Sequence, residues 1–157
     1  MPVSQSSIAF EKANIIFNNG AVCSSIAALA DKSEPEGLKM AYNYFQLCKN
    51  SYRESSNHQI HIAAGFFQFI NDNFLHPPSL DLSRDSIKCL VDLMLTQAQE
   101  TFIEKCLSEN KSGLLVSKLA IHVGSSYNSI VEEMANPTLQ NQFHPTWIQL
   151  LKVTLKT

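Results

Sequence analysis

Apolar side chains recur every three or four positions along most of the chain, which is the spacing of residues on one face of an α-helix. The first such stretch runs from about Ser7 to Ala30. It carries a stripe of small and aromatic residues and a neighbouring apolar stripe, namely Phe10, Ala13, Phe17, Gly20, Ser24 and Ala27 beside Ile8, Ile15, Val22, Ile26 and Leu29. Two adjacent stripes predict a helix that packs on more than one side, with close approach of a neighbour at the small residues.

A second helix is predicted to begin near Pro35. Ser33 and Glu36 have the spacing of a capping box, and proline is favoured in the first helical turn. The periodicity continues through Phe45 and fades in the polar segment 48–62. It returns at residue 63 and is predicted to end before the consecutive prolines at 77 and 78, which cannot donate hydrogen bonds to a helix.

The clearest helix follows Ser83, a predicted N-cap, and keeps its apolar rhythm as far as Phe102. A loop at 108–113 separates it from another helix, which carries Leu115 and Leu119 and stops at Asn136-Pro137. A last helical segment is predicted to open at residues 144–145. No alternating strand pattern occurs, so the predicted fold is all-α, built of antiparallel helix hairpins joined by short loops.

Composition narrows the function classes. The chain has 157 residues with 12 Lys+Arg, 14 Asp+Glu and a net charge of -2, which argues against a basic nucleic-acid binder. Hydrophobic residues make up 45%, enough for a sizeable core. No window has eighteen uninterrupted apolar residues, so no transmembrane helix is predicted, and no secretory signal occurs in the first ten residues. Four cysteines without a CxxC pair predict reduced thiols in a cytosolic protein.

Candidate chemistry is sparse. His58 and His61 lie three apart, but only Glu54 stands near them at a useful spacing, so no metal site is predicted. His122 is predicted to be a core or groove histidine, and Glu132-Glu133 to be capping or solvated charge near a helix end. No GxSxG, HExxH or P-loop occurs. We therefore predict no catalytic residue, no cofactor and no enzymatic activity.

Phe102, Leu115 and Leu119 flank the predicted turn between two helices, with the leucines four apart on one face. Periodicity alone favours a core position for all three. The alternative is an apolar groove that accepts an amphipathic helix of a partner protein.

Several collinear motifs add to this picture. The segment 10–18 is FEKANIIFN, 36–39 is EGLK and 44–46 is YFQ. The longest run combines NFLHPPS at 73–79, DLSRD at 81–85 and MLTQAQE at 94–100. These motifs resemble the BRO1 domain family over most of the chain. Within that family they are most similar to the fungal alkaline-pH adaptor type (PalA), followed by the Alix type.

The resemblance implies a curved α-helical domain with a tetratricopeptide-like core, which binds the C-terminal amphipathic helix of an ESCRT-III filament subunit. Aligning the family's QAQE onto residues 97–100 places its apolar patch at Phe102, Leu115 and Leu119, which favours the groove over the core. A basic position falls on Lys39, while the acidic position four residues earlier is occupied by Pro35.

The implied role is that of a non-enzymatic, cytoplasmic adaptor recruited to endosomes for ambient (alkaline) pH signalling. The alternatives are an Alix-type cargo-sorting adaptor, a tyrosine phosphatase that carries a BRO1 domain, or a nonfunctional fragment of a larger BRO1 protein. No CxxxxxR phosphatase loop occurs in this chain.

BRO1 domains are considerably longer than this chain, so the resemblance implies that residues 1–157 form a partial domain, its middle portion. Missing flanks would leave helix faces exposed to water. The segment 48–62 interrupts what the family has as FQLxAGFF. Its codons can be written with an intron's donor, branch and acceptor sequences, so one hypothesis is a retained intron. The alternative is a genuine loop insertion that splits one helix into two.

Overall fold

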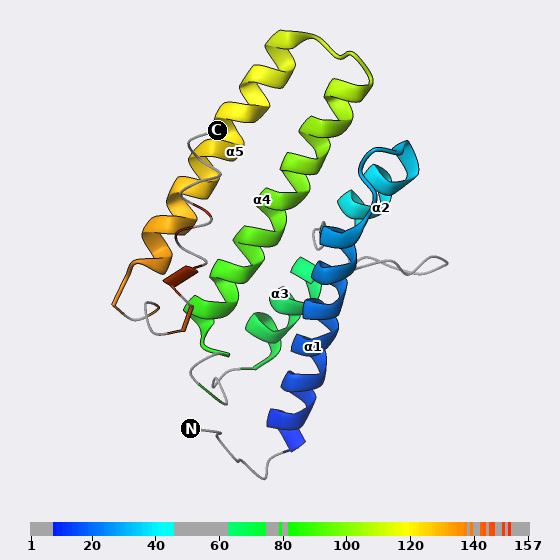
Figure 1. Cartoon of the computed structure of the whole chain (residues 1–157). Coiled ribbons are helices and arrows are strands. Elements are labelled where there is room, and N and C mark those ends of the chain that lie inside the picture. Colours follow the sequence, from blue (N-terminus) through cyan, green and yellow to red (C-terminus); the bar gives the residue numbers. More distant parts are fainter. Residues whose placement is uncertain are drawn as a thin grey trace.

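The described part of the chain is all-α, as predicted, and contains no strand (Figure 1). The computed structural model describes residues 8–45, 63–74, 79, 82–137, 139, 142–143, 145–146, 149 and 151. Its five helices are α1 (Ile8–Leu29), α2 (Pro35–Phe45), α3 (Ala63–Asn73), α4 (Arg84–Ser108) and α5 (Gly113–Met134). The segment 48–62, with its insertion or retained-intron hypothesis and the pair His58 and His61, lies outside the described residues.

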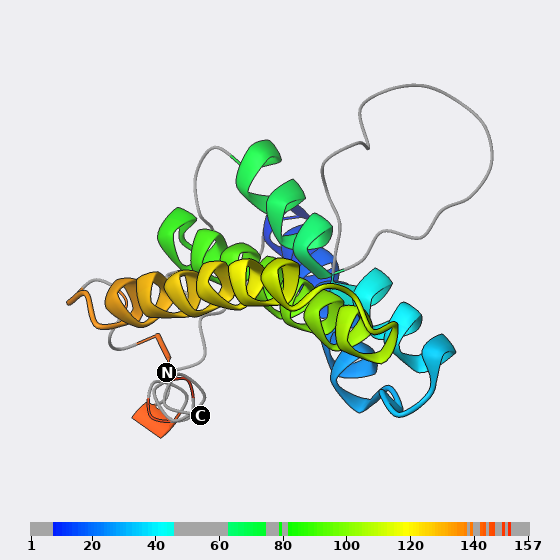
Figure 2. The ribbon, with the colours of Figure 1, turned by 90° about the horizontal axis from the view of Figure 1, so that it is seen from above.

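Helix α4 is the centre of the packing. It contacts α2, α3 and α5, while α1 packs on α2 and α3. Figure 1 shows α4 with α5 along one side and the other three helices on its other side, and Figure 2 shows α5 running along α4 when seen from above. Lys88 near the start of α4 meets Glu133 near the end of α5 at 2.6 Å, so these two helices form the predicted antiparallel hairpin.

Side-chain caps fix where the hairpin helices begin. Ser83 Oγ accepts a hydrogen bond from the Ser86 amide at 3.3 Å, which confirms the predicted N-cap of α4. Ser112 Oγ accepts from the Leu115 amide at 3.4 Å and caps α5 in the same way. Between the helices, Asn110 has a φ of 52°, a left-handed conformation that asparagine tolerates.

The predicted capping box at α2 is wrong, although the helix does begin at Pro35. The Ser33 hydroxyl donates to Asp31 Oδ1 at 2.6 Å, and the Ser33 amide donates to the same oxygen at 3.0 Å. These bonds hold Ser33 in the preceding turn. The first helical bond runs from the Leu38 amide to the Glu34 carbonyl, so Glu34 occupies the N-cap position.

The small-residue stripe of α1 faces the core, as predicted. Ala13, Gly20 and Ala27 are buried, and the ring of Phe67 from α3 lies against Gly20. A Cβ at Gly20 would lie 2.8 Å from that ring, so the helices approach closely because glycine has no side chain. Phe17 adds an aromatic contact, with its ring centroid 5.2 Å from that of Phe67.

The second stripe of α1 departs from the prediction that this helix packs on more than one side. Its residues are exposed in the described part of the chain: Ile8, Ile15, Val22, Ile26 and Leu29. Helix α1 therefore buries only its small-residue face here. An exposed apolar stripe of this length is unusual for a surface helix, and it agrees with the expectation that the chain is part of a larger domain.

Stability should fall at alkaline pH because of Cys89. Burial raises the pKa of the Cys89 thiol from 9.0 to about 12, so the folded chain keeps the thiol protonated where the unfolded chain ionises it. The stabilisation is complete below about pH 9 and is lost as the pH rises towards 12, at up to about 1.4 kcal/mol per pH unit. Urea unfolding at pH 7.5, 9 and 10.5 should show a steeper loss in the wild type than in Cys89→Ala. Parallel pH profiles would contradict this assignment.

Candidate functional site

Phe102 lies on a face of α4 that is partly exposed to solvent. Although the rest of that helix has many buried apolar residues, the Phe102 side chain is 37% exposed. Its ring packs on Tyr42 of α2, with centroids 5.9 Å apart and planes at 41°. Phe102 shares its face of α4 with Gln99 and Leu95, which are three and seven positions earlier. Phe102 is thus neither a core residue nor fully solvated.

Leu115 and Leu119 occupy neighbouring turns at the start of α5. Leu115 is 42% exposed and Leu119 is half-buried. Because they are four residues apart, their side chains lie on the same face of the helix. The adjacent Leu114 is 68% exposed and sits on a different face, so it serves as a natural comparison.

The register of the hairpin brings Phe102 and Leu119 to the same level. Lys88 contacts Glu133, and the Tyr127 hydroxyl donates to Glu100 Oε2 at 2.6 Å. Extending this antiparallel register places Phe102 opposite about residues 119–125 of α5. Leu115 then lies one turn nearer the hairpin tip. The three predicted apolar residues therefore all lie towards the hairpin end of the α4–α5 pair.

Lys39 lies on α2, which packs against α4. It is exposed and three residues before Tyr42, so both side chains share one face of α2. Tyr42 touches Phe102, so Lys39 lies on the same face of α2 as the residue that contacts Phe102. A hollow of about 340 Å³ adjoins it, lined by Glu36, Lys39, Met40, Asn43 and Tyr44. Pro35 is exposed one turn earlier and offers no carboxylate.

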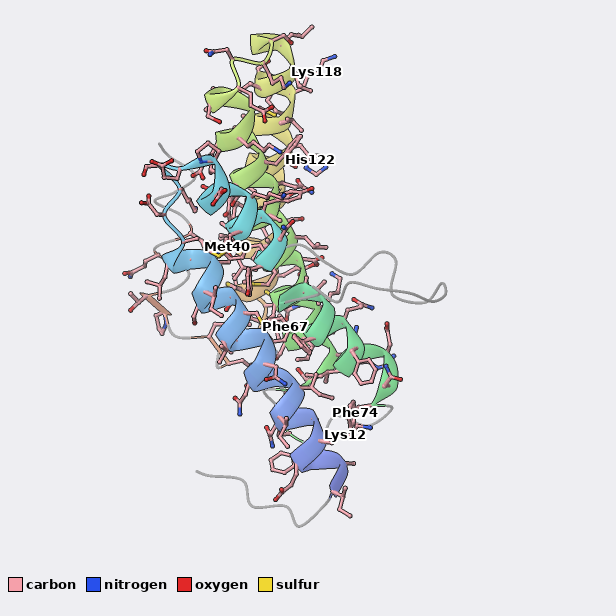
Figure 3. All side chains as sticks on the ribbon, turned by 90° about the vertical axis from the view of Figure 1, so that its right-hand side faces the viewer. Lys12, Met40, Phe67, Phe74, Lys118 and His122 are labelled. Carbon is pink, nitrogen blue, oxygen red and sulfur yellow. The ribbon has the colours of Figure 1, made fainter. Side chains whose placement is uncertain are left out.

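Helices α4 and α5 also border a polar hollow that the sequence did not reveal. A hollow of about 380 Å³ is bordered by Asp92, Leu95, Thr96 and Gln99 of α4 and by His122, Ser125, Ser126, Ser129, Ile130 and Glu133 of α5. His122 is exposed and lies 3.4 Å from Ser126 Oγ, so it is a groove residue and not a core residue. Figure 3 shows it pointing away from α1.

Charged side chains cluster at the end of this polar hollow that is farther from the turn between α4 and α5. Lys88 Nζ lies 2.6 Å from Glu133 Oε1 and 3.6 Å from Asp92 Oδ2. The hydrogen bond with Glu133 raises the pKa of Lys88, while burial raises the pKa of Asp92 against the opposing effect of Lys88. Glu132 is exposed, as predicted, but Glu133 is an ion-pair partner and not a merely solvated charge.

A larger hollow of about 620 Å³ lies on a different side of α4. Small residues of α1 line it, among them Ala21, Ser24 and Ala28, together with Leu93 and Phe143. Sequence reasoning found the small residues but not the hollow. None of the residues predicted to bind a partner borders it.

Other chemistry is limited within the described residues. No group of three or more metal-ligating side chains occurs among them, and Cys23, Cys89 and Cys106 are free thiols. None of the described helices is both long and apolar enough to cross a membrane.

Comparison with known proteins gives consistent similarities. The family model for the BRO1-like domain matches residues 1–156. The chain is 40% identical over 154 residues to the vacuolar protein-sorting protein bro-1 of Neurospora crassa, covering 98% of this chain and 14% of that protein. It is 35% identical over 145 residues to ALG-2 interacting protein X of Dictyostelium discoideum, covering 90% of this chain and 16% of that protein. The solved complex of ALIX BRO1 with CHMP4C is similar with a TM-score of 0.77 at 25% identity, over 98% of this chain and 39% of that chain. The chain thus spans about one seventh of the length of curated relatives such as bro-1 of Neurospora crassa.

Proposed function

The chain belongs to the BRO1-like domain family, and we propose that it is a non-enzymatic adaptor module whose α4–α5 groove binds a helix of an ESCRT-III subunit. The partner segment would be the subunit's C-terminal amphipathic helix. Its apolar face would cover Phe102, Leu115 and Leu119, and Lys39 would meet an acidic residue at the rim.

The observation that carries this proposal is the partial exposure of Phe102 and Leu115 towards the hairpin end of α4 and α5. Both side chains leave more than a third of their surface in water although α4 and α5 bury many other apolar residues. Apolar side chains gathered between two helices match the helix-in-groove mode of recognition, in which a partner inserts residues spaced three and four apart. Burial of these side chains would supply the main favourable free energy of binding.

The similarity to ALIX BRO1 supports the identity of the partner. That protein was solved in complex with CHMP4C, and nearly the whole of the present chain superposes on it. A direct test is fluorescence polarisation with a labelled peptide of the CHMP4C C-terminal helix. Saturable binding that a scrambled peptide of equal composition does not show is the expected result. Equal binding of the two peptides would remove the proposed function.

Lys39 should contribute charge to this interaction. Lys39→Glu places a carboxylate on the rim, so we expect the affinity for the peptide to fall about fivefold, with a larger loss at low salt. The matched control is Lys12→Glu, since Lys12 is an exposed lysine of α1 far from the groove. Polarisation titrations at low and high salt measure both effects. Equal affinities for the two variants would show that Lys39 is not at the interface.

The pathway served by the adaptor is a finer proposal. The motifs NFLHPPS and DLSRD favour ambient alkaline-pH signalling, with recruitment to endosomes through partners. Cargo sorting is the second candidate, favoured by the vacuolar protein-sorting names of relatives about 40% identical. Disruption of the gene distinguishes them. Loss of growth at alkaline pH with normal vacuolar sorting supports the first, and missorted cargo with normal alkaline growth supports the second.

We also propose that residues 1–157 form the middle part of a longer BRO1-like domain. The exposed apolar stripe of α1 supports this, because a neighbouring segment would bury it. The chain also corresponds to only 39% of the ALIX BRO1 chain in the complex.

A further inference from the structure

One face of α5 runs without a break from the apolar patch to the charged end of the hairpin. Leu119, His122, Ser126 and Glu133 follow one another at spacings of three, four and seven, so their side chains form a single stripe. On α4, side chains at the same helical spacing form a stripe from Phe102 to Asp92, and this stripe faces the one on α5. The polar hollow between these stripes is therefore in line with the proposed docking groove.

The groove changes its chemistry along its length. Its hairpin end is apolar, its middle carries hydroxyl, amide and imidazole groups, and its far end carries carboxylates. Asp92 and Glu133 share one ammonium group, that of Lys88, at 3.6 and 2.6 Å. Their side chains remain 40% and 35% exposed. Two carboxylates facing one ammonium leave an excess negative charge that a bound cation can reach.

The dimensions suit one continuous helix. From Leu115 to Glu133 the groove is roughly 27 Å long, about five turns of an α-helix at 1.5 Å per residue. Asp92 lies roughly 15 Å along α4 from Phe102, about ten helical residues. A partner helix that is anchored on the apolar patch and follows the groove must cross the polar middle before it reaches the carboxylates.

We propose that the partner helix continues past its apolar anchors and places a basic residue, about ten positions away, against Asp92 and Glu133. This inference rests on the proposed function and adds a specificity determinant to it. The apolar end supplies affinity, while the charged end selects helices that carry a cation at the right distance. A helix with an acidic residue at that position would face two carboxylates, so the contact would add no affinity.

Five labelled peptides test the proposal on the full chain. The first contains only the apolar anchor turns of the CHMP4C C-terminal helix. The other four extend it along a neutral helical sequence, two at the N-terminal end and two at the C-terminal end, and each pair carries either Lys or Glu about ten positions from the anchors. We expect one Lys-extended peptide to bind about threefold to fivefold more tightly than the anchor peptide, while its Glu counterpart shows no gain.

Charge-neutralising variants assign the gain to the two carboxylates. Asp92→Asn and Glu133→Gln should each reduce the Lys-dependent gain and leave the affinity for the anchor peptide unchanged. Glu132→Gln is the matched control, because Glu132 is the exposed neighbour of Glu133 on a different face of α5. If all the peptides bound with equal affinity, or if the Lys-dependent gain in affinity persisted in both variants, the proposed contact of a basic residue with the two carboxylates would be wrong. The proposed function would not be affected by that result. Failure of the anchor peptide to bind would overturn the proposed function together with this contact.

Discussion

Leu115→Asp should abolish capture of the ESCRT-III helix. The substitution puts a carboxylate at the partly exposed apolar position nearest the hairpin tip, where a docked helix would have to desolvate it without a partner. For a central interface residue we expect at least a ~30-fold loss of affinity, measured by polarisation with the CHMP4C peptide. The far-UV circular dichroism should stay near that of the wild type, because the side chain is not part of the core.

Leu114→Asp is the matched control for this variant. It introduces the same charge one residue earlier, in the same first turn of α5, and an acidic residue there suits the helix dipole in both variants. Leu114 faces away from the groove and is 68% exposed, so its affinity for the peptide should remain within about twofold of the wild type. Equal losses in both variants would point to a change at the helix start, and no loss in Leu115→Asp would remove that residue from the site.

Gly37→Ala should produce a large loss of stability for so small a change. A Cβ at this position would lie 1.7 Å from the Asp31 carbonyl oxygen, far inside contact distance, and 2.6 Å from its carbon. The obstacle is backbone and cannot rotate away. The turn that contains it is held by the bonds between Ser33 and Asp31 and by the ion pair of Lys32 with Glu104 at 3.6 Å.

The expected cost of Gly37→Ala is about 2 kcal/mol or more, since overpacking exceeds the helix propensity that alanine gains over glycine. Urea unfolding followed by circular dichroism measures it as a lower midpoint. Gly124→Ala is the control, because a Cβ there meets nothing within 4 Å, and it should be neutral or stabilising by up to about 1 kcal/mol. A Gly37→Ala midpoint equal to that of Gly124→Ala would show that the α1–α2 turn is not fixed as described.

Helices and their ends were predictable wherever local chemistry decides them. Ser83 is an N-cap because its own side chain reaches the first turn of α4. Ser33 has the same local signature, but Asp31 two residues earlier takes its hydroxyl, so the capping box does not form. The competition between two local partners for one hydroxyl cannot be resolved from spacing alone.

The hydrophobic periodicity could not predict the groove. Phe102 continues the same three-four rhythm as buried residues of α4 such as Ala98, and only the positions of α2 and α5 leave it partly open. Its prediction came from the resemblance and not from the pattern. The second apolar stripe of α1 is the opposite case. The helical spacing of its residues predicted burial, but they are exposed in the described structure.

The charged end of the groove was missed for a related reason. Asp92 and Glu133 lie on different helices, and their approach depends on the register of the hairpin, which no local motif specifies. The contacts of Lys88 with both carboxylates reveal it. In the sequence, the only sign of this charged cluster is that polar residues occur among the residues of the two facing stripes.

Site-specific photo-crosslinking tests the central claim most directly. A benzophenone amino acid is placed at Leu119 in the groove and, separately, at Ile26 on the exposed stripe of α1. On irradiation with the CHMP4C helix peptide, we predict a covalent adduct from position 119 that an excess of unlabelled peptide suppresses, and none from position 26. Crosslinking from position 26, with none from position 119, would place the partner on another face and contradict the proposed groove.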